Sequence, residues 1–126
     1  MSYNICTLEY LGSPNHVAIF IEDGQHGSGT IYHVIGNILV GMEFQIKPAK
    51  RPDLSESFVP GTQRQLGRIQ KADVVSFEAL CRSVPPPGAQ LKLNGRPKDP
   101  SKPIRRCGEW VHEVADKALS QGIITR

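Results

Sequence analysis

Paired cysteine motifs are absent from this chain. Its three cysteines, Cys6, Cys81 and Cys107, are odd in number, and no two of them form a Cys-x-x-Cys pair. This pattern argues against a disulfide framework and against the usual ligand spacing of a tetrahedral zinc site. We therefore expect reduced thiols in a reducing compartment, with no metal and no cofactor.

Long apolar runs and aromatic residues are also scarce. No stretch approaches the ~18 consecutive apolar residues of a membrane span, and the N-terminus lacks the basic and then apolar order of a signal peptide. Aromatic residues make up 6% of the chain, and its net charge of +3 is spread through loops without a nucleic-acid-binding motif. We expect a cytoplasmic protein with no transmembrane anchor and no nucleic-acid partner; its oligomeric state is not indicated.

The chain does contain enough apolar residues to fold. Its 126 residues are close to the commonest domain size, and 39% apolar with 21% charged residues is typical of folded proteins. The 10 prolines and 12 glycines predict long loops. We expect a single domain over residues 1–126.

Alternating apolar residues predict an antiparallel sheet of about four to five strands. A glycine-rich turn joins two of these strands in a hairpin. The loose pattern of residues 4–10 indicates a short edge strand. The expected strands cover residues 4–10, 16–22, 30–35, 40–47 and 66–69, with a brief further segment at 90–94.

Two main helices complete an expected α+β fold. Asp73 is placed to cap a helix whose apolar residues recur every three to four positions, and this spacing makes Cys81 a core residue. The sequence Pro85-Pro86-Pro87-Gly88 is expected to end this helix. The last helix is expected over residues 107–120, with Trp110 packed beneath Cys107.

Cys107 stands where the chain favours a reactive thiolate. At a helix start it meets free N–H groups and the positive end of the helix dipole, and Arg105 and Arg106 directly before it add positive charge. A histidine within reach would activate the thiol further. The alternative is that Cys107 is a small buried residue at the start of a core helix, which is the commoner fate of cysteine.

Two histidines in the expected hairpin are candidate bases. If the turn centres near Gln25, His16 lies opposite Ile35, and His33 is its diagonal neighbour on the same face at about 7 Å. Either histidine alone is equivocal, because a strand histidine is often simply hydrogen-bonded within the fold. Together with Cys107 they supply a nucleophile, a base and an orienting residue.

These segments resemble the circularly permuted papain-like hydrolases. The likeness rests on the strand His16-Val-Ala-Ile-Phe, the second strand ending at His33, and the late helix Cys107-Gly-Glu-Trp-Val, in that order. The chain is similar to the branch of the NlpC-like superfamily that contains lecithin:retinol acyltransferase and the HRAS-like suppressor acyltransferases. It also resembles the PPPDE isopeptidases and a group of small, mostly fungal, uncharacterised proteins.

The resemblance implies a permuted papain-like fold with the catalytic cysteine at the N-terminus of the C-terminal helix. Cys107 would form a thioester with an acyl group, His16 would act as general base and then acid, and His33 would orient His16. The Cys107 backbone N–H would contribute to the oxyanion hole. Two departures argue against a lipid substrate: Arg106-Cys107-Gly-Glu-Trp replaces Asn-Cys-Glu-His-Phe, and no hydrophobic anchor follows Arg126.

We therefore expect a cysteine hydrolase or acyltransferase that forms a covalent acyl-enzyme from an amide, thioester or ester of a small-molecule, acyl or peptide substrate. The alternative is a non-catalytic module that binds a peptide or acyl chain on the same fold. A metal site built from His16, His33 and Cys107 is a third possibility, although it lacks an obvious fourth ligand. Loops 48–61 and 95–103 are expected to border the cleft.

Overall fold

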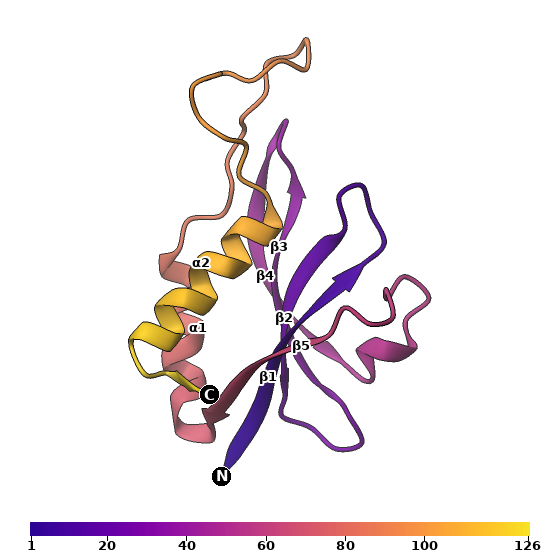
Figure 1. The fold of residues 1–126 in the computed structure, drawn as a ribbon, viewed down its shortest axis with the longest axis vertical. Coiled ribbons are helices and arrows are strands. Elements are labelled where there is room, and N and C mark those ends of the chain that lie inside the picture. The colour runs from indigo at the N-terminus through magenta and orange to yellow at the C-terminus, as the bar shows by residue number, and fades with distance from the viewer.

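The computed structural model describes residues 1–126 as a six-stranded antiparallel sheet with two α-helices (Figure 1). The strands lie in the spatial order β4-β3-β2-β1-β5-β6. Their bounds are β1 Ser2–Tyr10, β2 His16–Glu22, β3 Gly29–Asn37, β4 Gly41–Ala49, β5 Arg64–Gln70 and β6 Ile124–Thr125. The helices are α1 Val74–Ser83 and α2 Cys107–Ser120, with short 3-10 helices η1 Pro52–Leu54 and η2 Lys71–Asp73. The expected α+β class and antiparallel pairing are confirmed.

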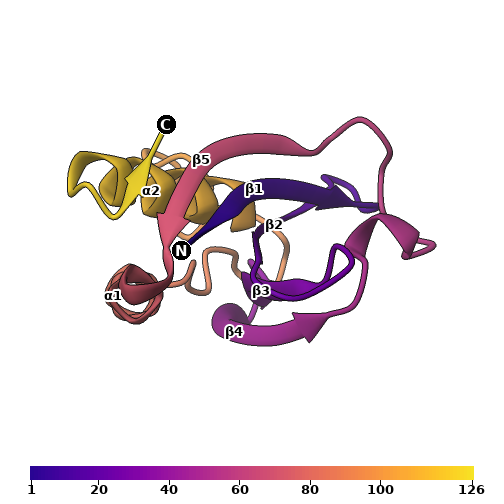
Figure 2. The same cartoon turned by 90° about the horizontal axis from the view of Figure 1, so that it is seen from below.

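The sheet is covered differently on its two faces. Both helices lie on one face, and the loop that carries η1 lies on the other (Figures 1 and 2). Ile19 and Ile21 of β2 belong to the larger core cluster against the helices, whereas Ala18 and Phe20 belong to a smaller cluster on the opposite face. Because side chains alternate along a strand, His16 lies on the same face as Ala18 and Phe20.

The central hairpin opens into a fork. Strands β2 and β3 pair only from Ile19–Tyr32 to Ile21–Thr30. Beyond that point β2 continues along β1 as far as the Tyr10–His16 pair, while β3 continues along β4 to the hairpin tip. Figure 1 shows the first turn of α2 next to the place where β2 and β3 separate.

Strand β1 is a central strand, so its prediction as a short edge strand is wrong. It runs for nine residues and pairs with both β2 and β5. Ile5 packs in the larger cluster, whereas Cys6 and Leu8 pack in the smaller one. The apolar alternation is loose because both faces of this strand are buried.

The C-terminal parts of the sheet also differ from the prediction. The segment 90–94 forms no strand, only an isolated bridge between Leu91 and Pro97, and the nearby prolines cannot donate ladder hydrogen bonds. Strand β5 is longer than expected, and the sheet gains the two-residue β6 beside it. Two residues are too few to show a strand period in the sequence.

Both helices begin where expected. Asp73 is the residue before α1, although its side chain makes no capping hydrogen bond. Cys81 and Trp110 are 0% exposed, so their predicted core positions are confirmed. Neither helix is long and apolar enough to cross a membrane.

Candidate active site

Cys107 is held in the fork between β2 and β3. It is the first residue of α2, and only 7% of it is exposed. Its Sγ accepts a hydrogen bond from the backbone N–H of Val17 at 3.5 Å. Val17 lies two residues beyond the last β2–β3 pair, so its N–H is not used by β3. The thiol therefore lies against the backbone of the residue that follows His16.

The start of α2 has no side-chain cap. Arg106 occupies the capping position, but a guanidinium group has no acceptor atom. Glu109 Oε1 instead accepts a hydrogen bond from the Arg106 backbone N–H at 3.0 Å. The N–H groups of the first turn are left without a side-chain acceptor, and their partial positive charge is concentrated at Cys107.

The two arginines before Cys107 do not share one role. Arg105 donates to the carbonyl of Pro85 at 2.7 Å and forms an ion pair with Glu113 at 2.6 Å. The Arg106 side chain makes no ion pair and lines the cavity that contains Cys107. Of the two charges expected beside the thiol, only that of Arg106 is free to act there.

His16 and His33 are joined by a hydrogen bond. His16 Nε2 lies 2.8 Å from His33 Nδ1, and His33 Nε2 lies 2.8 Å from Gln45 Oε1. His33 is 4% exposed and His16 is half-buried. The three β2–β3 pairs have the predicted register, which would place His16 opposite Ile35 if the pairing continued. The strands separate before that point, so this pair does not form, but His16 and His33 still lie on one face and their rings meet.

The hydrogen bonds select one tautomer for each neutral imidazole. Gln45 Oε1 can only accept, so His33 Nε2 carries the proton and its Nδ1 is an acceptor. His16 Nε2 must then donate to His33 Nδ1. The Nδ1 of His16 is left unprotonated, which is the state that a general base needs.

Both imidazoles are held in the neutral form. Burial lowers the pKa of His16 to about 4, with further lowering by the positive charges of His33 and Lys47. Burial also lowers the pKa of His33; the hydrogen bond to Gln45 opposes this shift, and Lys47 adds to it. At neutral pH, His16 is therefore an uncharged base rather than the positive member of a resting ion pair.

The lowered pKa values predict a loss of stability in mild acid. A group whose pKa falls on folding binds more protons when unfolded, so its contribution is complete above about pH 6.5 and is lost as pH falls toward 4. Allowing for solvent screening of a half-buried ring, we expect the free energy of unfolding to drop by about 1–2 kcal/mol over this range. Urea denaturation at stepped pH measures it. The drop should be smaller in His16→Gln and unchanged in His112→Ala. A drop in His16→Gln as large as that of the wild type would contradict the lowered pKa of His16.

Gln45 is a site residue that the sequence analysis missed. It pairs directly with His33 across β3 and β4, on the face shared with His16. In the sequence, Glu43, Gln45 and Lys47 alternate with apolar residues and look like an ordinary solvent-facing side of a strand. The available signal was the β3–β4 register together with the need of a buried His33 for an acceptor.

Removing the Gln45 acceptor should slow any acylation of Cys107 that uses His16 as its base, without removing that base. In Gln45→Leu we expect acylation of Cys107 to fall about 10-fold, because His33 no longer fixes the tautomer of His16. Gln45→Glu keeps an acceptor, so it should retain the rate while raising the pKa of both imidazoles. Acylation rates and imidazole NMR titrations test this. A Gln45→Leu variant with the wild-type rate would contradict the positioning role.

Two hollows meet at the histidine pair. A cavity of about 480 Å³ contains Cys107, Arg106, His16 and His33 and is otherwise largely apolar. Its further lining residues include Pro14, Val34, Ile35, Ile38 and Met42. A groove of about 780 Å³ shares both histidines but not Cys107. We call these the thiol cavity and the lysine groove.

The two loops expected at the cleft behave differently. Residues of the loop after β4, among them Lys50, Leu54 and Ser57, line the lysine groove. No residue of 95–103 lines either hollow, so the expectation that this loop borders the cleft is wrong. The Gln90 side chain forms hydrogen bonds with both the N–H and the carbonyl of Arg105. These bonds join the two ends of the connection between α1 and α2 just before Arg106.

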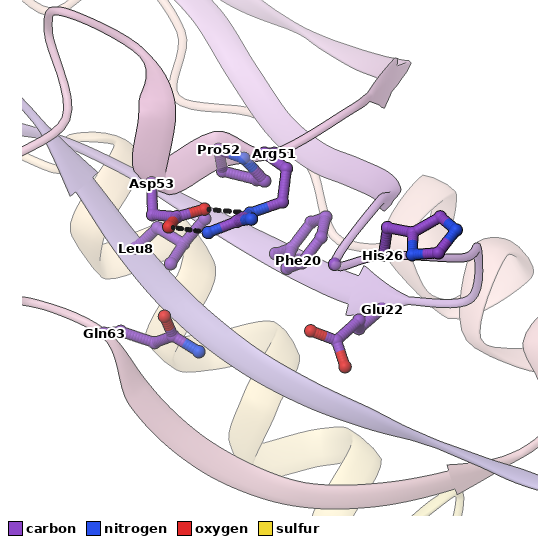
Figure 3. Close-up of a pocket in the computed structure, with 9 residues that line it drawn as sticks. Leu8, Phe20, Glu22, His26, Arg51, Pro52, Asp53 and Gln63 are labelled. Carbon is purple, nitrogen blue, oxygen red and sulfur yellow. Dashed lines mark hydrogen bonds and ion pairs between the residues drawn. The ribbon is translucent and has the colours of Figure 1, made fainter.

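A third hollow lies away from Cys107 and the histidine pair. Figure 3 shows its polar lining, in which Arg51 forms two hydrogen bonds with Asp53 above Leu8 and Phe20. Its volume is about 380 Å³, and neither Cys107 nor the histidine pair contributes to it. No group of three or more His, Cys, Asp or Glu side chains is arranged to hold a metal ion. The metal site considered from His16, His33 and Cys107 therefore has no ligand set.

The fold and site define an α+β protein with a helix-start cysteine beside a histidine pair. The chain belongs to DUF6540, a family of unknown function, whose profile matches residues 5–125. No curated protein and no solved structure matches the chain.

Proposed function

We propose that this chain is a cysteine hydrolase or acyltransferase of permuted papain-like type, with Cys107 as nucleophile, His16 as base and His33 as the residue that positions His16. The observation that carries the proposal is the hydrogen-bonded chain from Gln45 through His33 to His16. The next residue after His16 is Val17, whose backbone N–H donates to Cys107 Sγ. The order of the residues along the chain, histidines first and cysteine last, fits the permuted arrangement.

The first half of the reaction forms an acyl-enzyme. The thiol proton of Cys107 passes to His16 Nδ1 as the sulfur attacks the substrate carbonyl carbon. The carbonyl oxygen becomes an oxyanion near the uncapped N–H groups of the first turn of α2. When the intermediate collapses, the bond to the leaving group breaks, the leaving group takes the proton from His16, and a thioester to Cys107 remains.

The second half of the reaction decides the class of enzyme. Water, an amine or an alcohol attacks the thioester carbon and gives its proton to His16. The carbon–sulfur bond then breaks, and the proton returns to Cys107. Water makes the protein a hydrolase, and an amine or alcohol makes it an acyltransferase. The apolar lining of the thiol cavity favours an acyl group without charge near the reacting carbon.

Trapping the acyl-enzyme tests this function. We expect S-acetyl mercaptoethanol, a small neutral thioester, to acetylate Cys107 and leave the other thiols unmodified, as measured by mass spectrometry of peptides. Cys6 and Cys81 are internal controls, because burial raises their pKa values to about 11 and about 12. No adduct should form at position 107 in Cys107→Ser. A wild-type Cys107 that is never acetylated, or is no faster than Cys6, would favour the binding module instead.

A further inference from the structure

The lysine groove has an unbalanced charge. Three basic residues line it, Lys47, Lys50 and Arg51, and no aspartate or glutamate does. Its remaining surface is formed by the histidine pair, Tyr10 and small or apolar residues. A concave surface with one sign of charge raises the local concentration of ligands of the opposite sign.

Only the lysines contribute uncompensated charge. The Arg51 guanidinium is bound by both carboxylate oxygens of Asp53, at 3.0 and 2.6 Å (Figure 3). Lys47 and Lys50 form no ion pair. An ammonium group that has no partner within the fold is free to bind an anionic group of a ligand.

Lys47 lies next to the histidine pair. It pairs with Ile31 across β3 and β4, two positions along each strand from the pair of His33 with Gln45, so all four residues share a face. Its charge also contributes to the low pKa of both His16 and His33. An anion bound at Lys47 would therefore lie within electrostatic reach of the catalytic pair.

The two hollows could hold the two parts of a substrate that lie on either side of the bond to be broken. The reacting carbon must contact Cys107 Sγ, which lines the thiol cavity but not the lysine groove. The leaving group must take its proton from His16, which lines both hollows. In the proposed reaction this would place the acyl group in the thiol cavity and the leaving group in the lysine groove.

From this arrangement we propose that Lys47 and Lys50 form a subsite for a carboxylate or phosphate on the leaving group. The inference rests on the acyl-transfer function proposed above and adds the substrate class: an ester, thioester or amide whose leaving group is an anion. The same subsite would bind an anionic acyl acceptor, because leaving group and acceptor occupy the same side of the acyl-enzyme.

Three acetyl thioesters of similar size test the subsite. S-acetyl mercaptoethanol has a neutral leaving group, S-acetyl 3-mercaptopropionate has a carboxylate, and S-acetyl 2-mercaptoethyl phosphate has a phosphate. We expect one or both anionic compounds to acetylate Cys107 about 5-fold faster than the neutral one at low salt, and whichever is faster identifies the anion. The preference should fall with added salt, because the lysines are exposed.

Matched variants assign the preference to the groove. In Lys47→Gln/Lys50→Gln the anionic and neutral compounds should react at nearly equal rates. The readout is the ratio of the anionic to the neutral rate within each protein, because loss of Lys47 also changes the pKa of His16 and with it the absolute rates. Lys92→Gln removes an exposed lysine that lines neither hollow and should keep the preference. Equal rates in the wild type, or a preference that survives the double substitution, would overturn the subsite and leave the acyl-transfer function standing.

A binding measurement keeps the inference testable if Cys107 is not acetylated at all. The probes are 3-(methylthio)propionate and 2-(methylthio)ethyl phosphate, which mimic the leaving groups but cannot react. We expect at least one to shift the imidazole NMR signals of His16 and His33 saturably in the wild type and in Lys92→Gln, but not in Lys47→Gln/Lys50→Gln. The absence of saturable shifts in the wild type with both probes, or their persistence in the double variant, would overturn the subsite whatever the acetylation result.

Discussion

Acetylation of Cys107 by S-acetyl mercaptoethanol should slow by about 100- to 10,000-fold in His16→Ala, the range that a positioned general base supplies. The substitution removes the one nitrogen of the histidine pair that the hydrogen bonds leave as a free acceptor. It leaves in place the Val17 N–H that contacts the thiol and the first turn of α2, so the proposed oxyanion donors of that turn remain. Rates measured from pH 5 to 9 separate loss of the base from a shifted pH profile.

A surface histidine provides the matched control. The His112 side chain is 80% exposed on α2 and contacts only Asp116 among the acidic groups. His112→Ala should react at the wild-type rate. Circular dichroism and urea denaturation of both variants separate a catalytic loss from unfolding. A folded His16→Ala that is within about threefold of the wild type would remove His16 from the mechanism, because a positioned general base typically contributes about 100- to 10,000-fold.

Trp110→Ala should lower the free energy of unfolding by about 3–5 kcal/mol, the cost of removing a large buried aromatic side chain. Trp110 is 0% exposed, its ring centre lies 5.6 Å from that of Phe44, and its indole N–H donates to the Val84 carbonyl at 3.0 Å. Urea denaturation monitored by circular dichroism measures the change. The variant should also lose Cys107 reactivity, because α2 would no longer be fixed against the sheet.

Trp110→Phe guards against a variant that does not fold. It retains most of the apolar surface but leaves the buried Val84 carbonyl without its donor, so the cost should be about 1–3 kcal/mol. His112→Ala again serves as the control on the same helix and should stay within about 0.5 kcal/mol of the wild type. A Trp110→Ala protein as stable as His112→Ala would show that α2 is not held by this side chain.

The parts of the site that follow local chemistry could be predicted from the sequence. The glycine-rich turn after β2 sets the hairpin register, which brings His16 and His33 to one face. Apolar spacing places α2 over residues 107–120 and so puts Cys107 at its start. Both features depend on residues that are close in the sequence. The assignment to the permuted papain-like fold remains a prediction.

The remaining features depend on contacts between distant segments. The burial of both faces of β1 comes from its pairing with β2 and β5, and β6 is too short to show a pattern. The role of Gln45 needs the β3–β4 register, because its neighbours give it the appearance of a surface residue. The fork between β2 and β3 could not be predicted from the sequence of β2. The side chains of β2 alternate between the two faces both where it pairs with β3 and where it does not.

The low pKa of His16 affects the two proton transfers of the proposed acylation step in opposite ways. A carboxylate in place of Gln45 would stabilise an imidazolium strongly, whereas the hydrogen bond to the amide only partly opposes the effects of burial and Lys47 on the pKa of His33. With a pKa of about 4, His16 is a weak base but, once protonated, a strong acid. In the proposed mechanism, removal of the thiol proton would then be the costly event, and expulsion of the leaving group would follow readily. Poor leaving groups such as amines, which must be protonated to depart, would gain most from such a strong acid.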